Sequence, residues 1–271
     1  MHTQQPIIPI GTSQNHDSTL AGQEAARMAA DRLDTGASAG WAMAFCGGRH
    51  DRNAVLQGLR SQVGEAEFVG GSAVGTITGS SLGYSGYECA VAVFPGSLPK
   101  PTIVVANGLD TSETQPGQHL GASLREVAKD GDTVLLFYDS IRSGPPPVLY
   151  VGSRLLDGLY QGLDGKELKL IGAGTIGDFQ MQESYVLAGQ RCLKHTAVAV
   201  VMPSVFRSHT TIMHGCMPVS SFLEITRIDG AVVYELDGRP ALDVLLEMMG
   251  QESSPAATDQ LPLTMTLGKK H

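Results

Sequence analysis

One stretch of this chain occurs twice, and the repetition restricts the fold more than any other feature of the sequence. Residues 68–95, FVGGSAVGTITGSSLGYSGYECAVAVFP, resemble residues 170–203, LIGAGTIGDFQMQESYVLAGQRCLKHTAVAVVMP. In each copy a short apolar run leads into a glycine-rich turn, and the tetrapeptide Ala-Val-Ala-Val follows near the end. Self-similarity at a fixed spacing is typical of repeated structural units. The repeat therefore predicts two similar halves.

The residues before each copy extend the similarity and indicate the fold class. Residues 42–46, AMAFC, resemble residues 134–138, VLLFY, and a helical run follows each of them. Strands that alternate with helices indicate a sheet with helices packed against it. We therefore expect an α/β (α+β) fold with halves at about residues 17–110 and 111–203. Each half is expected to form a mixed β-sheet flanked by helices, and the two halves are expected to close into a layered sandwich. The sequence does not determine the order of the strands.

Local patterns give the expected elements. Asp17 and Asp51 each precede a helical run as a side chain that can cap its first turn. Three adjacent prolines, at positions 145–147, precede another such run, and Pro is favoured at a helix start. The expected helices cover residues 17–36, the run from residue 51, and residues 119–129, 147–162 and 240–249. The expected strands cover residues 41–45, 68–69, 88–94, 102–106, 132–138, 168–171, 183–188 and 193–202, with further strands within 205–235.

Three motifs together carry a resemblance to a known family. The glycine turn GGSAVG of residues 70–75, the segment HGCMPV of residues 214–219 and the segment VYELDGRPA of residues 233–241 follow one another in this order. In this order they resemble the FIST N-terminal domain family, from about residue 20 to residue 250. The resemblance implies a sensory module of signal transduction that binds a small ligand such as an amino acid. It also implies an alternative, since some members bind haem and sense nitric oxide.

The resemblance also implies a domain organisation. Residues 1–16 are expected to be a loose lead-in, and residues 17–250 a FIST N-type domain whose part 204–250 supplies linker strands and a helix. Residues 251–271 read as a linker and the start of a further segment. In the family a C-terminal FIST domain follows at this point, and we expect it to be absent or truncated here.

Charge and apolar content exclude some partners. The formal net charge is -8, and no run of basic residues occurs, which argues against nucleic acid. No apolar run approaches the roughly 18 residues of a membrane-spanning helix, so we expect no membrane partner. Cys46, Cys89, Cys192 and Cys216 are dispersed and are predicted to be buried thiols rather than disulfides. We expect a cytoplasmic protein.

Polar residues that follow the predicted strand ends form the candidate ligand site. A ligand pocket is usually concave and mainly apolar, with a few converging polar groups. If the halves face one another, Arg142 would bind a carboxylate, and Asp178 or Asp139 an ammonium group. The expected ligand-binding residues are Gly71, Ser72, Thr76, Asp139, Arg142, Gly174 and Asp178. Solvated loop residues are the alternative interpretation of each.

Other chemistries have weaker support. His214 stands beside Cys216 and Met217 and is the candidate haem ligand, although turn geometry explains the same residues. Residues 172–177 fit G-x-G-x-x-G, but a β-like run follows where a dinucleotide site needs a helix. Ser72 lacks the second glycine of G-x-S-x-G, and no metal-binding motif occurs. His195 is read as a buried, hydrogen-bonded histidine.

The prediction is therefore a non-catalytic sensor with no resident cofactor, haem being the alternative. An enzyme of unknown reaction is the second alternative, because no nucleophile–base pair is identified by spacing. The expected partners are a small-molecule ligand and a separate signalling protein, such as a histidine kinase or cyclase, since no output segment occurs in these residues.

Overall fold

A computed structural model describes residues 7–211, 221–230, 232–248 and 250 of the chain. The chain divides into two compact units, Met1–Ser208 and His209–His271. Each unit is described by itself. His214, Cys216 and residues 251–271, which carried predictions from the sequence, lie outside the described residues.

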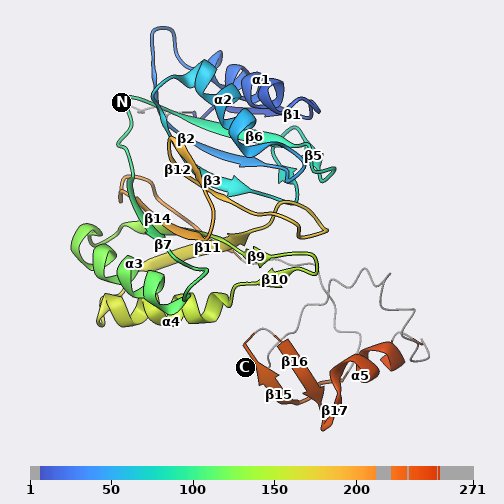
Figure 1. Cartoon of the computed structure of the whole chain (residues 1–271). Coiled ribbons are helices and arrows are strands. Elements are labelled where there is room, and N and C mark those ends of the chain that lie inside the picture. Colours follow the sequence, from blue (N-terminus) through green and yellow to red (C-terminus); the bar gives the residue numbers. More distant parts are fainter. Residues whose placement is uncertain (1–6, 212–220, 231, 249, 251–271) are drawn as a thin grey trace. The chain divides into compact units, whose positions relative to one another are not determined.

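From residue 7 onward, the first unit contains four helices and two main sheets (Figure 1). The helices are α1 (Ser18–Ala30), α2 (Arg52–Val63), α3 (Thr114–Val127) and α4 (Gly152–Leu163). The strands of the first sheet are β1 (Ile10–Ser13), β2 (Ala39–Cys46), β3 (Glu67–Ser72), β6 (Cys89–Pro95), β12 (Val186–Gly189) and β13 (Arg191–Leu193). The strands of the second sheet are β7 (Thr102–Asn107), β8 (Thr133–Asp139), β11 (Lys169–Thr175) and β14 (Thr196–Met202). Two short hairpins complete the unit, β4 (Thr76–Ile77) with β5 (Leu82–Gly83) and β9 (Ile141–Ser143) with β10 (Val148–Leu149).

The two sheets repeat one order and one set of strand directions. The first sheet has the order β1-β6-β2-β3-β12-β13, and the second has the order β11-β8-β14-β7. β2 pairs parallel with β3 and antiparallel with β6, as β8 pairs parallel with β11 and antiparallel with β14. β1 and β7 occupy matching edges. The first sheet differs by the added hairpin β12–β13, which comes from the second half of the sequence.

Three apolar clusters hold the layers together. Trp41, Val69 and Val186 of the first sheet meet Val198 and Val200 of the second in a cluster between the sheets. A second cluster joins the first sheet to α1 and α2, and a third joins the second sheet to α3 and α4. Figure 1 shows the result, with a helix pair on each outer face and the sheets between them. The mixed α/β class and the layered arrangement expected from the sequence are confirmed.

Glycines set the distance between the helices of each outer pair. A Cβ atom at Gly22 of α1 would lie 2.3 Å from Val55 O of α2, and one at Gly58 of α2 would lie 2.0 Å from Thr19 O of α1. Gly121 and Gly158 play the same part between α3 and α4, with Cβ positions 2.1 and 2.2 Å from carbonyl oxygens of the other helix. The helix backbones touch at these points, which only glycine permits.

The second unit contains a small antiparallel sheet and one helix among its described residues. The sheet has the order β15-β16-β17, from β15 (Ile225–Asp229), β16 (Val232–Leu236) and β17 (Arg239–Pro240). Helix α5 (Ala241–Met248) follows directly. Leu236, Ala241 and Val244 form its core, with Leu223, Val233 and Leu245 packed against them. The strands expected within residues 205–235 are therefore found only from Ile225 onward in the described part.

Both predicted helix caps were right, but several predicted element bounds were wrong, such as the helix over 17–36, which ends at Ala30. Asp17 Oδ1 accepts from Leu20 N at 2.9 Å and Asp51 Oδ1 from Ala54 N at 2.8 Å, so both helix caps are confirmed. The helix expected over 147–162 begins only at Gly152, because Val148 and Leu149 pair with β9 in a hairpin. The strand expected over 193–202 is split, since β13 ends at Leu193 and β14 begins at Thr196.

Candidate functional site

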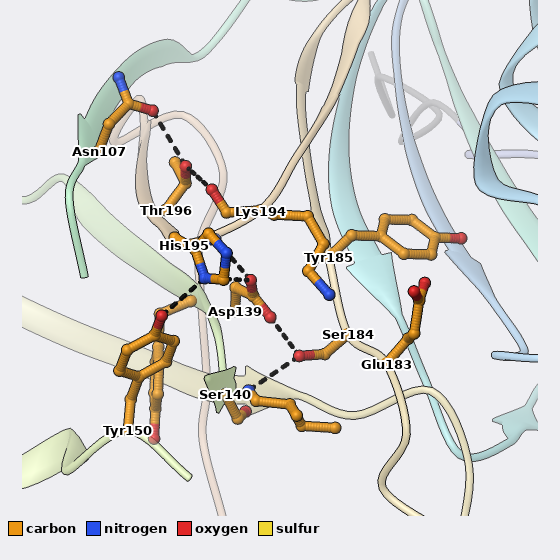
Figure 2. Close-up of polar contacts among 12 residues, drawn as sticks. Asn107, Asp139, Ser140, Tyr150, Glu183, Ser184, Tyr185, Lys194, His195 and Thr196 are labelled. Atoms are coloured by element: carbon orange, nitrogen blue, oxygen red, sulfur yellow. Dashed lines mark hydrogen bonds and ion pairs between the residues drawn. The ribbon is translucent and has the colours of Figure 1, made fainter. Parts of the chain in front are cut away.

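Several polar residues meet at one end of the second sheet. β7, β8 and β11 run in one direction and β14 in the other, so the carboxyl ends of three strands adjoin the start of the fourth. These positions are Asn107, Asp139, Thr175 and Thr196. In open α/β sheets, ligands bind beyond the carboxyl ends of the strands. Figure 2 shows the polar contacts formed there.

Asp139 is the buried centre of this cluster. Its side chain is fully buried, and its two carboxylate oxygens accept hydrogen bonds from different segments. Oδ1 accepts from the hydroxyl of Ser184, and Oδ2 accepts from the backbone N–H of His195 at 2.5 Å. Ser184 Oγ in turn accepts from Ile141 N at 2.9 Å. The carboxylate therefore joins the end of β8 to the segments that precede β12 and β14.

His195 lies where the chain turns into β14. Its φ angle is +53°, in the left-handed region that non-glycine residues seldom adopt, and the bond from its N–H to Asp139 fixes this turn. Its Nδ1 lies 2.6 Å from the hydroxyl of Tyr150 and 3.9 Å from Asp139 Oδ2. The side chain is 37% exposed, so the imidazole remains accessible to solvent although Asp139 and Tyr150 bond this residue. His195 makes the hydrogen bonds expected of it, but it is not buried.

The environment shifts two ionisable groups of the cluster. Burial raises the pKa of the Asp139 carboxyl, while the hydrogen bonds from Ser184 and His195 N–H act in the opposite direction. Burial, followed by the negative charges of Asp139 and Asp110, raises the pKa of Tyr150 to about 12. The phenol therefore keeps its proton at neutral pH, and its hydroxyl lies within hydrogen-bond distance of His195 Nδ1.

Charged groups of both signs influence Tyr150. Asp110, Glu113 and Arg142 all act electrostatically on its phenol. Arg142 is exposed, and its Nη2 donates to the carbonyl oxygen of Asp110 at 3.0 Å. Glu113 Oε1 accepts from Val151 N at 3.3 Å. One cationic and two anionic side chains thus act on the Tyr150 phenol, a combination of charges that complements a small zwitterion.

Asp139, Arg142 and Gly174, predicted from the sequence, belong to this end of the second sheet. Asp139 ends β8, Arg142 follows in β9, and Gly174 precedes the last residue of β11. A Cβ atom at Gly174 would lie 2.2 Å from Ser140 Oγ, which itself donates to Thr175 O at 2.7 Å. The absence of a side chain at Gly174 therefore leaves room for the hydrogen bond between Ser140 and Thr175.

Gly71 and Ser72 reach the same region from the first sheet. Ser72 is 2% exposed, and its Oγ accepts from Tyr185 N at 3.1 Å. A Cβ atom at Gly71 would lie 2.3 Å from Tyr185 O. Since Tyr185 follows Ser184, the strand ends of both halves meet at one dipeptide.

Thr76 and Asp178 are placed elsewhere. Thr76 begins the β4–β5 hairpin and is buried there. Asp178 lies in the loop after β11, where its Oδ1 accepts from Gln180 N at 2.9 Å. Among the described residues, the hydrogen bonds of neither side chain reach the Asp139 cluster.

Tyr150 and Ser184 were not identified from the sequence, and His195 was read as structural. The three come from separate segments. His195 and Ser184 meet Asp139 through the pairing of β8 with β14 and the crossing of the chain into the first sheet, and Tyr150 contacts His195. A polar residue directly before an apolar strand was the one available signal, and it applies to His195.

The described residues contain no group of three or more His, Cys, Asp and Glu side chains that could hold a metal ion. Cys46, Cys89 and Cys192 are free thiols, the first two buried. None of the helices in the described ranges is long and apolar enough to cross a membrane. The haem prediction rests on His214, outside these ranges.

The repeated sheets and the polar cluster define a layered α/β protein with a candidate binding site at the strand ends. Sequence comparison gives its family, because the FIST N domain matches residues 40–239. The chain belongs to the FIST family, whose domains are sensory domains of signal transduction.

Two uncharacterized proteins of Mycobacterium tuberculosis, from strains CDC 1551 / Oshkosh and ATCC 25618 / H37Rv, are each 27% identical to the chain over 245 residues. Each match covers 89% of this chain and 59% of the relative, so the chain spans less than two thirds of their length. Among solved structures, a cyanuric acid hydrolase from A. caulinodans gives a TM-score of 0.34 at 12% identity, covering 73% of this chain and 72% of the hydrolase. That similarity is too low to support an argument about fold or activity.

Proposed function

We propose that this chain is a cytoplasmic sensory module that binds a small molecule, with amino acids as the first class to test, and signals to a separate partner. A histidine kinase or a cyclase is the kind of partner proposed. The observation that carries the proposal is the cluster in which buried Asp139 orients His195, Tyr150 bonds His195, and the charges of Asp110, Glu113 and Arg142 act on Tyr150.

The charges around Tyr150 favour a ligand with both a carboxylate and an ammonium group. Arg142 would bind the carboxylate, as the sequence suggested. Asp139 already accepts from Ser184 and His195, so Asp110 or Glu113 is better placed than Asp139 to accept from an ammonium group. Tyr150 and His195 would supply further hydrogen bonds to the ligand. Arg142 therefore keeps the role expected from the sequence, and the role of binding the ammonium group passes from Asp139 to Asp110 or Glu113.

The segment before β12 supports a route for the signal. Ser184 donates to Asp139, and the next residue, Tyr185, bonds Ser72 at the end of β3. A ligand that moves Asp139 or His195 would therefore act on a strand of the other sheet. This contact couples the candidate site to both halves of the unit.

A thermal-shift screen of the amino acids tests the proposal. A ligand that binds only the folded state at 100 times its Kd stabilises that state by about 2.7 kcal/mol. We expect one amino acid to raise Tm in the wild-type protein and to lose most of that effect in Tyr150→Phe and Arg142→Ala. Tyr150→Phe removes only a hydroxyl group, which makes it the sharper of the two variants.

Arg125→Ala is the matched control, because it removes another exposed arginine, one that pairs with Asp164 on the helix pair. Its ligand-induced shift should equal that of the wild type. Equal shifts in all four proteins would show that a bound amino acid lies elsewhere, and no shift from any amino acid would contradict this ligand class. An absorption spectrum of the same sample, expressed with haem supply, tests the alternative, for which a Soret band lost on His214→Ala is expected.

A further inference from the structure

The outer edge of β11 has no strand beside it in the described part of the first unit. β11 is the end strand of the second sheet and pairs only with β8. Gly172 and Ala173, in its middle, are exposed. A sheet edge of this kind presents unpaired backbone N–H and C=O groups to any other strand.

The equivalent edge of the first sheet is covered by another strand. That pairing shows what kind of element fits against such an edge. β3 corresponds to β11, and β12 pairs with it antiparallel, with Val186 opposite Gly71 and Leu187 opposite Gly70. The next strand, β13, contacts the flank of α2, where Cys192 Sγ donates to Arg52 O at 3.4 Å. An antiparallel strand therefore covers the edge, and its hairpin covers the adjacent helix.

The flank of α4 that corresponds to the covered flank of α2 is exposed and apolar. Leu155, Leu159 and Leu163 face the sheet, and Gly158 and Gly162 face α3. At about 3.6 residues per turn, Leu156 and Tyr160 fall on the side of α4 away from α3. Since α3 lies over β7 and β14, that side is the β11 side.

The exposed fractions agree with this placement. Leu156 is 36% exposed and Tyr160 is 59% exposed. An open hollow of about 440 Å³ continues from Tyr160 to the start of β11, lined by Tyr160, Leu163, Gly165, Lys166, Glu167 and Leu168. We call the β11 edge, Leu156, Tyr160 and this hollow together the β11 surface. It combines free backbone groups with apolar side chains, and the charged Lys166 and Glu167 also line the hollow.

We propose that the β11 surface is the interface between two copies of this chain, related by a two-fold axis. A two-fold axis perpendicular to a sheet pairs identical edge strands antiparallel, which is the direction that β12 adopts against β3. Leu156 and Tyr160 lie near the middle of α4, and Gly172 is the middle residue of β11. One axis can therefore bring both elements against their copies and form a continuous eight-stranded sheet from two four-stranded ones.

The sequence of β11 also fits pairing with a copy. Natural edge strands that stay unpaired usually carry charges, proline or a bulge. β11 has one charged residue, Lys169, at its first position, and neither proline nor charge from Leu170 to Thr175. The centre of a two-fold pairing would therefore bring no like charges together. The inference does not depend on ligand binding at the Asp139 cluster.

Sedimentation velocity of the whole chain at micromolar concentration tests the proposal. We expect the wild type to sediment as a dimer, at twice 28.5 kDa. The double variant Leu156→Glu, Tyr160→Glu places four charges in the interface and should weaken dimerisation on the order of 100-fold or more. Hydrogen exchange should show protected amides of β11 in the wild type and faster exchange in the double variant.

A second apolar pair gives the matched control. The rings of Tyr84 and Phe179 pack edge-to-face, and the two residues are 66% and 67% exposed. They lie outside the β11 surface, so the double variant Tyr84→Glu, Phe179→Glu should leave the dimer intact. If Leu156→Glu, Tyr160→Glu unfolds the protein, Ala173→Glu at the exposed strand position replaces it. A monomeric wild type, or a dimer that survives both the helix and the strand variants, overturns the proposal.

Discussion

Glu88 shows how one carboxylate fixes a turn in the first half of the chain. It directly precedes β6, as His195 directly precedes β14, and it is 2% exposed. Oε1 accepts from Ser85 N at 2.7 Å and Ser85 Oγ at 2.9 Å, and Oε2 accepts from Gly86 N at 2.9 Å. Burial alone would raise the pKa of this carboxyl, but these hydrogen bonds together hold the pKa below its ordinary value.

We expect Glu88→Gln to lower the free energy of unfolding by about 1–3 kcal/mol at neutral pH, because an amide oxygen replaces two acceptor oxygens and leaves buried donors unpaired. Since the folded-state pKa is lowered, the wild-type advantage is present above the ordinary pKa of 4.5 and is lost as pH falls through the folded value. Urea denaturation of both proteins over a pH series measures this. The exposed Glu67→Gln is the control, and a difference that is unchanged on acidification would contradict the prediction.

Cys46 and Cys89 form a second buried contact in the first half. Their Sγ atoms lie 3.3 Å apart, and the two residues face each other across β2 and β6. Contact with Cys89, and then burial, raises the pKa of the Cys46 thiol well above its ordinary value. Because the thiolate is the reactive form, iodoacetamide should modify Cys46 in the native protein only as fast as the protein opens. Peptide mass spectrometry measures that rate. Modification as fast as in urea would contradict this prediction.

At the level of single residues, the sequence predicted the strand-end positions better than their partners. Asp139 could be proposed because it directly follows an apolar run, and it is indeed the last residue of β8. Ser184, Tyr150 and His195 could not be joined to it, because they are 45, 11 and 56 residues away along the chain and meet it through sheet pairing. Solvent-facing Arg142 and buried Asp139 looked alike in the sequence, since spacing does not report burial.

Among elements, the helix pairs depend on glycine. A Cβ atom at Gly158 would lie 2.2 Å from the carbonyl oxygen of Thr114 on α3, so Gly158→Ala should force α3 and α4 apart. Although alanine favours a helix, we expect a net loss of about 1–3 kcal/mol in the free energy of unfolding, from overpacking. Thermal and urea denaturation measure the loss. Gly79→Ala is the control, because nothing lies within 4 Å of its Cβ position. Equal stability of the two variants would contradict close helix contact.

The order of the elements could be predicted because apolar periodicity and capping residues are local. The repeat also placed residues 42–46 and 134–138 in corresponding strands, and these are β2 and β8. The hairpin β9–β10 could not be predicted in this way. Val148 and Leu149 have helix-compatible side chains, and only their pairing with β9 makes them a strand. Strand order was likewise left open, because it depends on contacts between distant segments.

For the whole molecule, we expect residues 1–208 to fold without the rest of the chain. They form one compact unit, and, among the residues that the structure describes, the three clusters that join its layers consist of its own residues. The fragment should unfold cooperatively, with a near-ultraviolet circular dichroism spectrum that shows fixed aromatic packing. Calorimetry measures the unfolding transition. A fragment without a cooperative transition would contradict the prediction that residues 1–208 fold by themselves. The same fragment should retain the dimer, since the β11 surface lies within it.

The crossing of β12 and β13 into the first sheet has a consequence for synthesis on the ribosome. β3 receives its neighbour from residues 186–189, with β13 following, although the other strands of the first sheet end at Pro95. When the first half of a growing chain has emerged from the ribosome, the edge of β3 is therefore still exposed. About ninety residues after Pro95 must follow before that edge is covered. Although the halves look alike, the first is not expected to be a folding unit, because its sheet is completed only after β12 of the second half has been synthesised.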